Sequence, residues 1–218
     1  MDKSSASAKA EILRRIRAAI GRGSDQETAL DQWGGLARGY RRGATRSREE
    51  QVNLLTDRLR DYGAHVVRVE ESAVAETVSR VLRDRGKKRM VVPMGLAEEW
   101  LPGGIEIVED DGIAATALDG FDGVMTGATL AIAETGTVVL QSVAGQGRRA
   151  ITLVPDYHLC VVRVRDVVET VPEAMARLRK TAELPTTFFS GPSATADIEM
   201  TRIKGVHGPR HLDVILVD

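Results

Sequence analysis

The sequence contains one cysteine, Cys160, and no long apolar run. One cysteine cannot form an internal disulfide, and alone it cannot hold a zinc ion or an iron–sulfur cluster. No apolar run approaches the ~20 residues that a membrane-spanning helix needs. Residues 1–21 also lack the uncharged apolar core of a signal peptide. These absences predict a cytoplasmic protein with no membrane span.

An excess of charge of either sign is also missing. The 218 residues include 30 Lys and Arg against 31 Asp and Glu, which gives a net charge of −1. A chain balanced in this way does not attract nucleic acid through its overall field, so no nucleic-acid partner is expected. An apolar share of 43% and a charged share of 28% are ordinary for a globular protein. The length predicts one full domain with an additional arm.

Several motifs of catalytic and cofactor-binding proteins do not occur. No GxGxxG opens a helix and no GxxxxGK[ST] is present, so dinucleotide and Walker-type phosphate binding lack support. The zinc motifs HExxH and paired CxxC are absent as well. Cys160 lies within an apolar segment and is interpreted as a core residue. We therefore expect no cofactor and no metal on this chain.

Residues 1–46 are expected to form a helix and a flexible arm ahead of a domain over residues 47–218. Apolar side chains over residues 8–20 recur with helical spacing and form one stripe, and Gly21 follows as a stop. This stripe would pack on the body of the protein or on a second subunit, so the sequence leaves open whether the chain forms a homo-oligomer. Residues 21–46 are rich in glycine and arginine and are interpreted as a mobile linker.

From residue 47 onward, helices and strands are expected to alternate. Ser47 and Glu50 have the spacing of a capping box. The periodicity predicts helices that begin at 47 and 72 and end at 63 and 86, with strands at 64–69 and 89–93. Further strands are predicted at 105–108, twice within 122–141, and at 151–154, 158–164, 186–190 and 212–217, with a helix over 170–182. This order argues for an α/β protein whose sheet is covered on both faces.

Two polar, glycine-rich segments interrupt the middle of the domain, one around Thr126 and one around Glu134-Thr135-Gly136. Small residues at strand ends let a ligand approach the backbone, and successive N–H groups can cradle an anion. The alternative is a hairpin with glycine at a positive φ. Glu134 is then either a surface residue or a carboxylate held at a site.

Two more segments lie near the carboxyl terminus. Ser193 and Thr195 follow an apolar strand and could donate hydrogen bonds to an anion at the carboxyl end of a parallel sheet. Ser193 could instead cap a helical turn over 194–199. His207 can exchange a proton near neutral pH, and Arg210 can bind a carboxylate through two parallel hydrogen bonds. The alternative for these two is a loop histidine beside a solvated arginine. His158 is interpreted as packing at the start of a strand.

Four ordered segments resemble one known family. They are AIAETGTVVL (131–140), LVPDYHLCVV (153–162), SGPSATADIE (190–199) and KGVHGPRHLDVILV (204–217). Together they are similar to the lactate-utilisation (LUD) domain family, and most similar to its short members without iron–sulfur cysteines. The resemblance covers about residues 47–218.

The resemblance implies a three-layer α/β/α sandwich similar to the group of CoA transferases, ribose-phosphate isomerase and formyltetrahydrofolate cyclo-ligase. It also implies a role in oxidising L-lactate to pyruvate together with two other lactate-utilisation subunits, one of which carries iron–sulfur clusters. Glu134-Thr135-Gly136 resembles the Glu-Asn-Gly turn of the related CoA transferases, except that threonine replaces asparagine.

On this basis we expect a pocket for a small carboxylate. Its residues would be Thr126, Glu134, Thr135, Gly136, Ser193, Thr195, His207 and Arg210. Arg210 would hold the carboxylate, and His207 or Glu134 would accept the proton of the 2-hydroxyl. Two alternatives stay open: a non-catalytic scaffold for an iron–sulfur partner, and a CoA- or acyl-transfer enzyme that uses Glu134.

Overall fold

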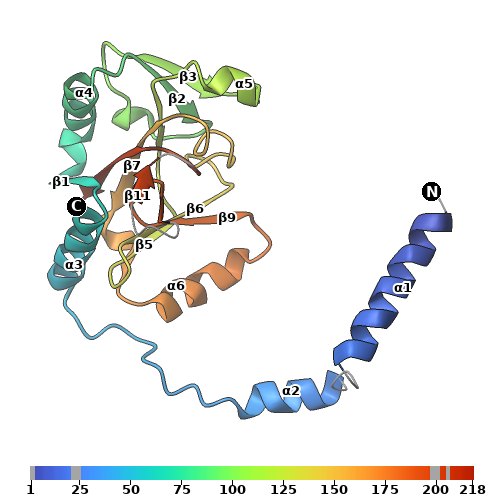
Figure 1. Cartoon of the computed structure of the whole chain (residues 1–218). Coiled ribbons are helices and arrows are strands. Elements are labelled where there is room, and N and C mark those ends of the chain that lie inside the picture. The colour runs from blue at the N-terminus through green and yellow to red at the C-terminus, as the bar shows by residue number, and fades with distance from the viewer. Residues whose placement is uncertain (1–2, 21–25, 197–201, 205–206) are drawn as a thin grey trace. The chain divides into compact units, whose positions relative to one another are not determined.

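A computed structural model describes residues 3–20, 26–196, 202–204 and 207–218 (Figure 1). The chain divides into two compact units, Met1–Tyr40 and Arg41–Asp218. The first unit contains helix α1 (Lys3–Ile20) and helix α2 (Gln26–Gly35). Helix α1 includes the expected helix and starts earlier, whereas α2 lies where only a linker was expected. No helix in the described part of the chain has both the length and the apolar character to cross a membrane.

The second unit is built on a parallel sheet of six strands. In spatial order these are β1 (His65–Val69), β12 (His211–Val217), β7 (Tyr157–Arg163), β4 (Gly123–Thr126), β2 (Arg89–Pro93) and β3 (Glu106–Asp110). The central strands are short apolar runs rich in valine, isoleucine and leucine, as expected for strands that are buried on both faces. Every pair of neighbouring strands is parallel, which confirms the central parallel sheet of an α/β protein.

Helices cover the two faces of this sheet. Helix α3 (Arg48–Asp61) begins with the capping box of Ser47 and Glu50, which confirms that prediction. It packs on the face of β7 that carries Cys160. Helix α4 (Val74–Asp84) packs on the opposite face. It follows the short 3₁₀-helix η1 (Glu71–Ala73), so the start expected at Ser72 belongs to a 3₁₀ turn.

A second sheet shares the α3 side of the parallel sheet. Its order is β8 (Val167–Val168), β5 (Leu130–Ile132), β6 (Thr137–Gln141) and β9 (Thr186–Phe189). Residues 122–141 therefore hold three strands divided between two sheets, and the expectation of two strands was wrong. The chain leaves the first sheet at Gly127, and the intervening turn is too short to be separated from the strands by composition. Helix α6 (Val171–Leu178) covers the outer face of the second sheet.

Three further expectations change. Residues 151–154 form turns and no strand. Ile151 is buried because it packs beside Val124 in the core, and not because it pairs with a neighbouring strand. Strand β9 runs antiparallel to β6, so the segment after it does not lie at the carboxyl end of the parallel sheet. Strand β10 (Ala194–Ala196) pairs with β11 (Arg202–Lys204), so residues 194–196 are extended; the rest of the expected helical turn lies outside the described residues.

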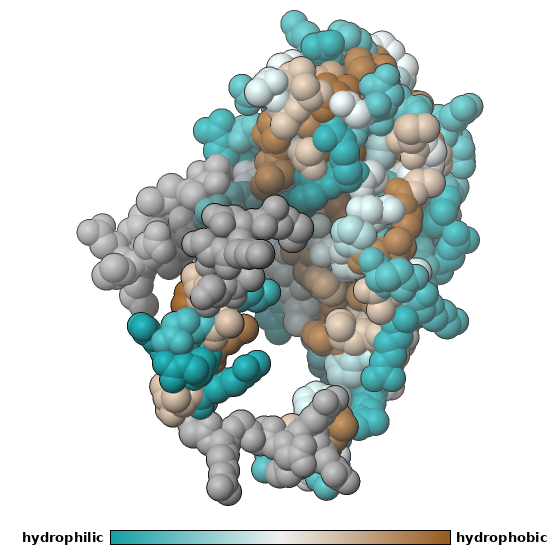
Figure 2. All heavy atoms as spheres, turned by 90° about the vertical axis from the view of Figure 1, so that its right-hand side faces the viewer, coloured by the Kyte–Doolittle hydropathy of each residue, from teal (hydrophilic) through white to brown (hydrophobic). Residues whose placement is uncertain are grey.

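The remaining elements are short. They are the 3₁₀-helices η2 (Glu98–Trp100), η3 (Val164–Asp166) and η4 (Arg179–Thr181) and the helix α5 (Ala115–Leu118). Hydrophilic and hydrophobic side chains are interspersed on the face of the molecule shown in Figure 2.

Candidate functional site

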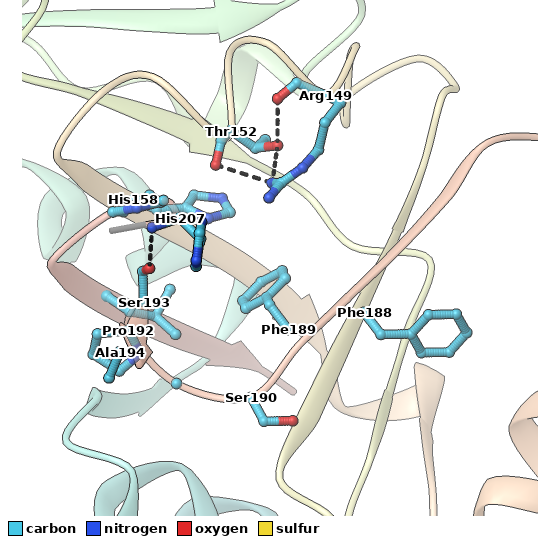
Figure 3. A pocket seen from close by; sticks show the side chains of 14 residues that line it. Arg149, Thr152, His158, Phe188, Phe189, Ser190, Pro192, Ser193, Ala194 and His207 are labelled. Atoms are coloured by element: carbon cyan, nitrogen blue, oxygen red, sulfur yellow. Dashed lines mark hydrogen bonds between the residues drawn. The ribbon is translucent and has the colours of Figure 1, made fainter. Parts of the chain in front are cut away.

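A cavity of about 240 Å³ lies at the amino ends of β7 and β12. We call it the histidine pocket. Its walls include Arg149, Thr152, His158, Phe189, Ser190, Ser193, His207 and Leu212 (Figure 3). Three parts of the chain that are far apart in sequence meet here: the loop before β7, the turn after β9, and the loop before β12. The site therefore depends on tertiary structure rather than on one motif.

His158 forms the inner wall of the histidine pocket. Side chains alternate along β7, so Leu159 faces α4 while His158 and Cys160 face the other side. Nε2 of His158 lies 2.8 Å from Oγ1 of Thr126 on the neighbouring strand β4. Burial, together with the positive charge of Arg149, lowers the pKa of His158 to about 3. His158 is therefore a neutral imidazole at physiological pH, and it offers hydrogen bonding without charge.

Cys160 lies two residues further along β7 and is fully buried. Its Sγ accepts a long contact of 3.7 Å from Oγ1 of Thr126, and burial raises the pKa of the thiol to about 12. A thiol in this environment is not a nucleophile near neutral pH. The interpretation of Cys160 as a core residue is confirmed.

Arg149 supplies positive charge to the histidine pocket. Its NH1 group donates to the carbonyl oxygen and to Oγ1 of Thr152, at 3.3 and 3.2 Å. Across the described residues, no carboxylate forms an ion pair with Arg149, although many other arginines of the domain have one. Figure 3 shows the Arg149 guanidinium reaching toward the two histidines. An anionic ligand would therefore meet an uncompensated guanidinium.

Ser193 and His207 form the opposite wall. The backbone N–H of His207 donates to Oγ of Ser193 at 3.1 Å, and the N–H of Ser193 donates to the carbonyl of Pro209 at 2.8 Å. The ring of Phe189 lies 5.3 Å from the ring of His158 and adds an apolar surface. The structure thus brings together two residues that the sequence placed in separate segments.

A row of hydroxyl groups leads from the β5–β6 turn to the pocket. Oγ1 of Thr135 lies 2.7 Å from Oγ1 of Thr137, which lies 2.7 Å from Oγ of Ser190. Gly136, at φ +59, lies in the same turn; a Cβ there would come 2.6 Å from Cβ of Arg58 on α3. Thr135 therefore reaches the histidine pocket only through intermediate hydroxyls, and Gly136 packs against a helix.

Glu134 lies in a different polar cluster. Its carboxylate is bound by Arg41, and Arg46 lies 4.0 Å away. The neighbouring Glu169 is fully buried and accepts the backbone N–H groups of Thr45 and Arg46 at 2.6 and 2.8 Å, together with both guanidinium groups. Burial acts to raise the pKa of Glu169, but these hydrogen bonds outweigh it and lower the pKa to about 2. Glu134 does not line the histidine pocket.

The other predicted site residues are also separated from the pocket. Nε of Arg210 donates to Oδ1 of Asp156 at 2.6 Å, and Arg210 is not among the lining residues. Thr126 lies behind His158, and Thr195 lies in β10 with its side chain outside the described part of the structure. Sequence analysis missed Arg149 and Thr152. The only local signal for them is the pair of arginines, Arg148 and Arg149, that follows Gly147. Such a pair is typical of any surface loop.

Comparison with known proteins gives consistent matches. A family model for the LUD domain matches residues 108–217, a segment that includes every residue of the histidine pocket. Lactate utilization protein C of Deinococcus radiodurans is 40% identical over 217 residues, covering 98% of this chain and 97% of that protein. Lactate utilization protein C of Halalkalibacterium halodurans is 27% identical over 188 residues, covering 79% of this chain and 81% of that protein. The crystal structure of a DUF162 family protein from D. radiodurans matches with a TM-score of 0.70 and 35% identity, over 79% of this chain and 99% of that chain.

Proposed function

Because the chain belongs to the LUD domain family, we propose that it acts in lactate utilization, as a subunit of a system that oxidises L-lactate to pyruvate. Relatives named Lactate utilization protein C that match over most of their length support this role. In this proposal the histidine pocket binds a small carboxylate. Two other subunits complete the system, and one of them carries iron–sulfur clusters.

One observation supports the pocket most strongly: an arginine to which no described carboxylate is paired faces a neutral histidine in a cavity of small-molecule size. Arginine binds carboxylates through two parallel charge-assisted hydrogen bonds. Because His158 is uncharged, it neither competes with the ligand for Arg149 nor repels the guanidinium. We therefore assign the carboxylate to Arg149, in place of Arg210, which is bound to Asp156 outside the pocket.

His207 is the residue in this pocket that could accept the proton of a 2-hydroxyl group. Conversion of lactate to pyruvate breaks the O–H and C2–H bonds and releases two protons and two electrons. One proton goes to His207, the other goes to solvent, and the two electrons pass to the iron–sulfur clusters of a partner. This chain has one cysteine, and that cysteine is buried, so its residues do not fit such a cluster. Within the described ranges, no group of three or more His, Cys, Asp or Glu is arranged to hold a metal ion.

Calorimetric titration of the full chain with L-lactate, pyruvate and acetyl-CoA tests the proposal. Lactate or pyruvate should bind saturably, and Arg149→Gln should weaken that binding about tenfold or more, since a charge-assisted hydrogen bond is lost. Arg210→Gln is the matched control and should leave the affinity unchanged. Binding of acetyl-CoA that requires Glu134 would favour acyl transfer, and no heat with any ligand in folded protein would favour a scaffold. Either result would contradict the proposal.

A further inference from the structure

We propose a second ligand site at the opposite end of the parallel sheet, which binds a small oxyanion through Arg163. A cavity of about 190 Å³ lies there, lined by residues just after β2, just after β4 and at the end of β7. We call it the switch pocket. Arg163 ends β7, whereas His158 stands near its beginning, five residues away, which corresponds to ~16 Å at ~3.3 Å per residue. The two cavities are therefore separate sites.

The position of the switch pocket in the fold favours ligand binding. Strands β2 and β4 are neighbours in the parallel sheet. The next strand of this sheet after β2 is β3, on one side of the pair, and the next after β4 is β7, on the other side. The connections that leave β2 and β4 therefore run in opposite directions. The crevice outside the carboxyl ends of two such strands is where ligands bind in open α/β sheets.

Three glycine turns form a fixed floor for this cavity. The N–H of Gly127 donates to the carbonyl of Gly145 at 2.7 Å, and the N–H of Gly145 donates to that of Met94 at 2.8 Å. Gly95 has a φ of +73, and a Cβ there would come 3.0 Å from Cβ of Ala144. A side chain at Gly95 would strain the backbone and crowd the neighbouring turn. The glycines at this wall carry no side chains that would fill the cavity.

Donors without acceptors line the switch pocket. Ala97 and Ala128 both line it, and within the described part of the chain their N–H groups have no hydrogen-bond acceptor. Nε of Arg163 is buried and also lacks a partner among the described residues. A ligand atom in this cavity could satisfy the N–H groups of Ala97 and Ala128, whereas Nε of Arg163 is closed to solvent.

Arg163 is held in place by its neighbours. Its guanidinium lies 4.8 Å above the ring of Trp100, and Nε1 of that ring donates to Oε1 of Glu71 at 2.8 Å. NH2 of Arg163 donates to Oε1 of Glu71 at 3.4 Å, and the two side chains form an ion pair. Stacking and this ion pair position the guanidinium, and no described residue accepts a hydrogen bond from its NH1 group.

These features define the chemistry of the ligand. A guanidinium and backbone N–H groups on two other loops recognise an oxyanion, either a phosphate or a carboxylate. Asp166 lines the same cavity and disfavours a second negative charge, but its carboxylate can accept a hydrogen bond from a hydroxyl group. The expected ligand is therefore a small, singly anionic molecule that also carries a hydroxyl or protonated oxygen.

Fluorescence of Trp100 tests the site directly. The chain has two tryptophans, so a Trp33→Phe background leaves Trp100 as the only one. The full chain in this background is titrated with inorganic phosphate and, separately, with L-lactate, at constant ionic strength. At least one of them should change the fluorescence saturably, and the one that does identifies the preferred oxyanion. Arg163→Gln should weaken this binding about tenfold or more.

Arg177→Gln is the matched control, because Arg177 is an exposed arginine of α6 that does not line the switch pocket. It should leave the titration unchanged, and so should Arg149→Gln, which separates this site from the histidine pocket. If Arg163→Gln does not fold, Arg163→Lys keeps the charge without the planar fork and should still bind more weakly than the parent. No saturable change with either anion, or a change that persists in both Arg163 variants, would overturn the proposal.

Discussion

Oγ1 of Thr126 and Nε2 of His158 lie 2.8 Å apart, across the neighbouring strands β4 and β7. Both side chains are buried, so neither can exchange this partner for bulk water. The hydrogen bond fixes the imidazole that forms the inner wall of the histidine pocket. A residue that sequence analysis expected to contact the ligand thus acts by orienting one that does line the cavity.

Thr126→Val should destabilise the fold by ~1–3 kcal/mol, because it removes a hydrogen-bond partner from a buried imidazole at almost constant volume. Urea denaturation of both proteins measures this difference. Thr187→Val on the half-buried strand β9 is the control and should change stability by less than ~0.5 kcal/mol. Equal losses in the two variants would mean that the Thr126–His158 bond does not stabilise the fold.

The depressed pKa of His158 predicts that stability falls as the pH falls from about 6.5 toward 3. In this window the unfolded chain binds a proton at His158 that the folded chain does not bind, so acid favours unfolding. Above the ordinary histidine pKa of about 6.5, the imidazole is neutral in both states and His158 causes no loss of stability. The slope of the unfolding free energy against pH approaches ~1.4 kcal/mol per pH unit where His158 is protonated only in the unfolded state.

Urea denaturation between pH 6 and pH 5 measures this slope in the parent and in His158→Gln. The variant should lose most of it, whatever its absolute stability. Glu169 does not interfere, because its pKa is lowered from 4.5 to about 2 and its contribution is lost only below that window. An unchanged slope in His158→Gln would show that another group controls the acid sensitivity.

Glu169→Gln should release residues 41–46 from the domain. The substitution removes the charge that binds two guanidinium groups and two backbone N–H groups, and we expect a loss of ~2 kcal/mol or more. Limited trypsin digestion reports the release, since Arg41, Arg42 and Arg46 are cleavage sites. Cleavage in this segment should become faster.

Glu134→Gln is the matched control for that experiment. Glu134 shares Arg41 with Glu169 but is 36% exposed and binds neither backbone N–H group. Its substitution should change trypsin cleavage much less. If both variants were cleaved equally fast, the buried carboxylate would not be what fastens the segment.

Local signals in the sequence predicted local structure well. The capping box at Ser47 and Glu50, the short apolar strands and the glycine after α3 all act within a few residues. The prediction of a strand over residues 151–154 was wrong because a short apolar run does not distinguish a strand of a sheet from a buried turn. Nothing local marked the passage of the chain from one sheet to the other after Thr126.

The candidate site was predictable only in part, for the same reason. Ser193 and His207 belong to glycine-rich loops that suggested a ligand, and they meet in the fold. The partner of Glu134 is Arg41, 93 positions away, and no spacing rule connects them. Arg149 resembles any arginine of a surface loop until the fold brings it near His158. Pairings of this kind depend on tertiary contacts and cannot be read from periodicity.

A crystal structure of the full chain grown with pyruvate or L-lactate would show where the carboxylate binds. We expect it in the histidine pocket, within hydrogen-bonding distance of the Arg149 guanidinium and beside His158 and His207. A ligand bound by Arg210, or a histidine pocket that stays empty in crystals saturated with both compounds, would contradict this expectation.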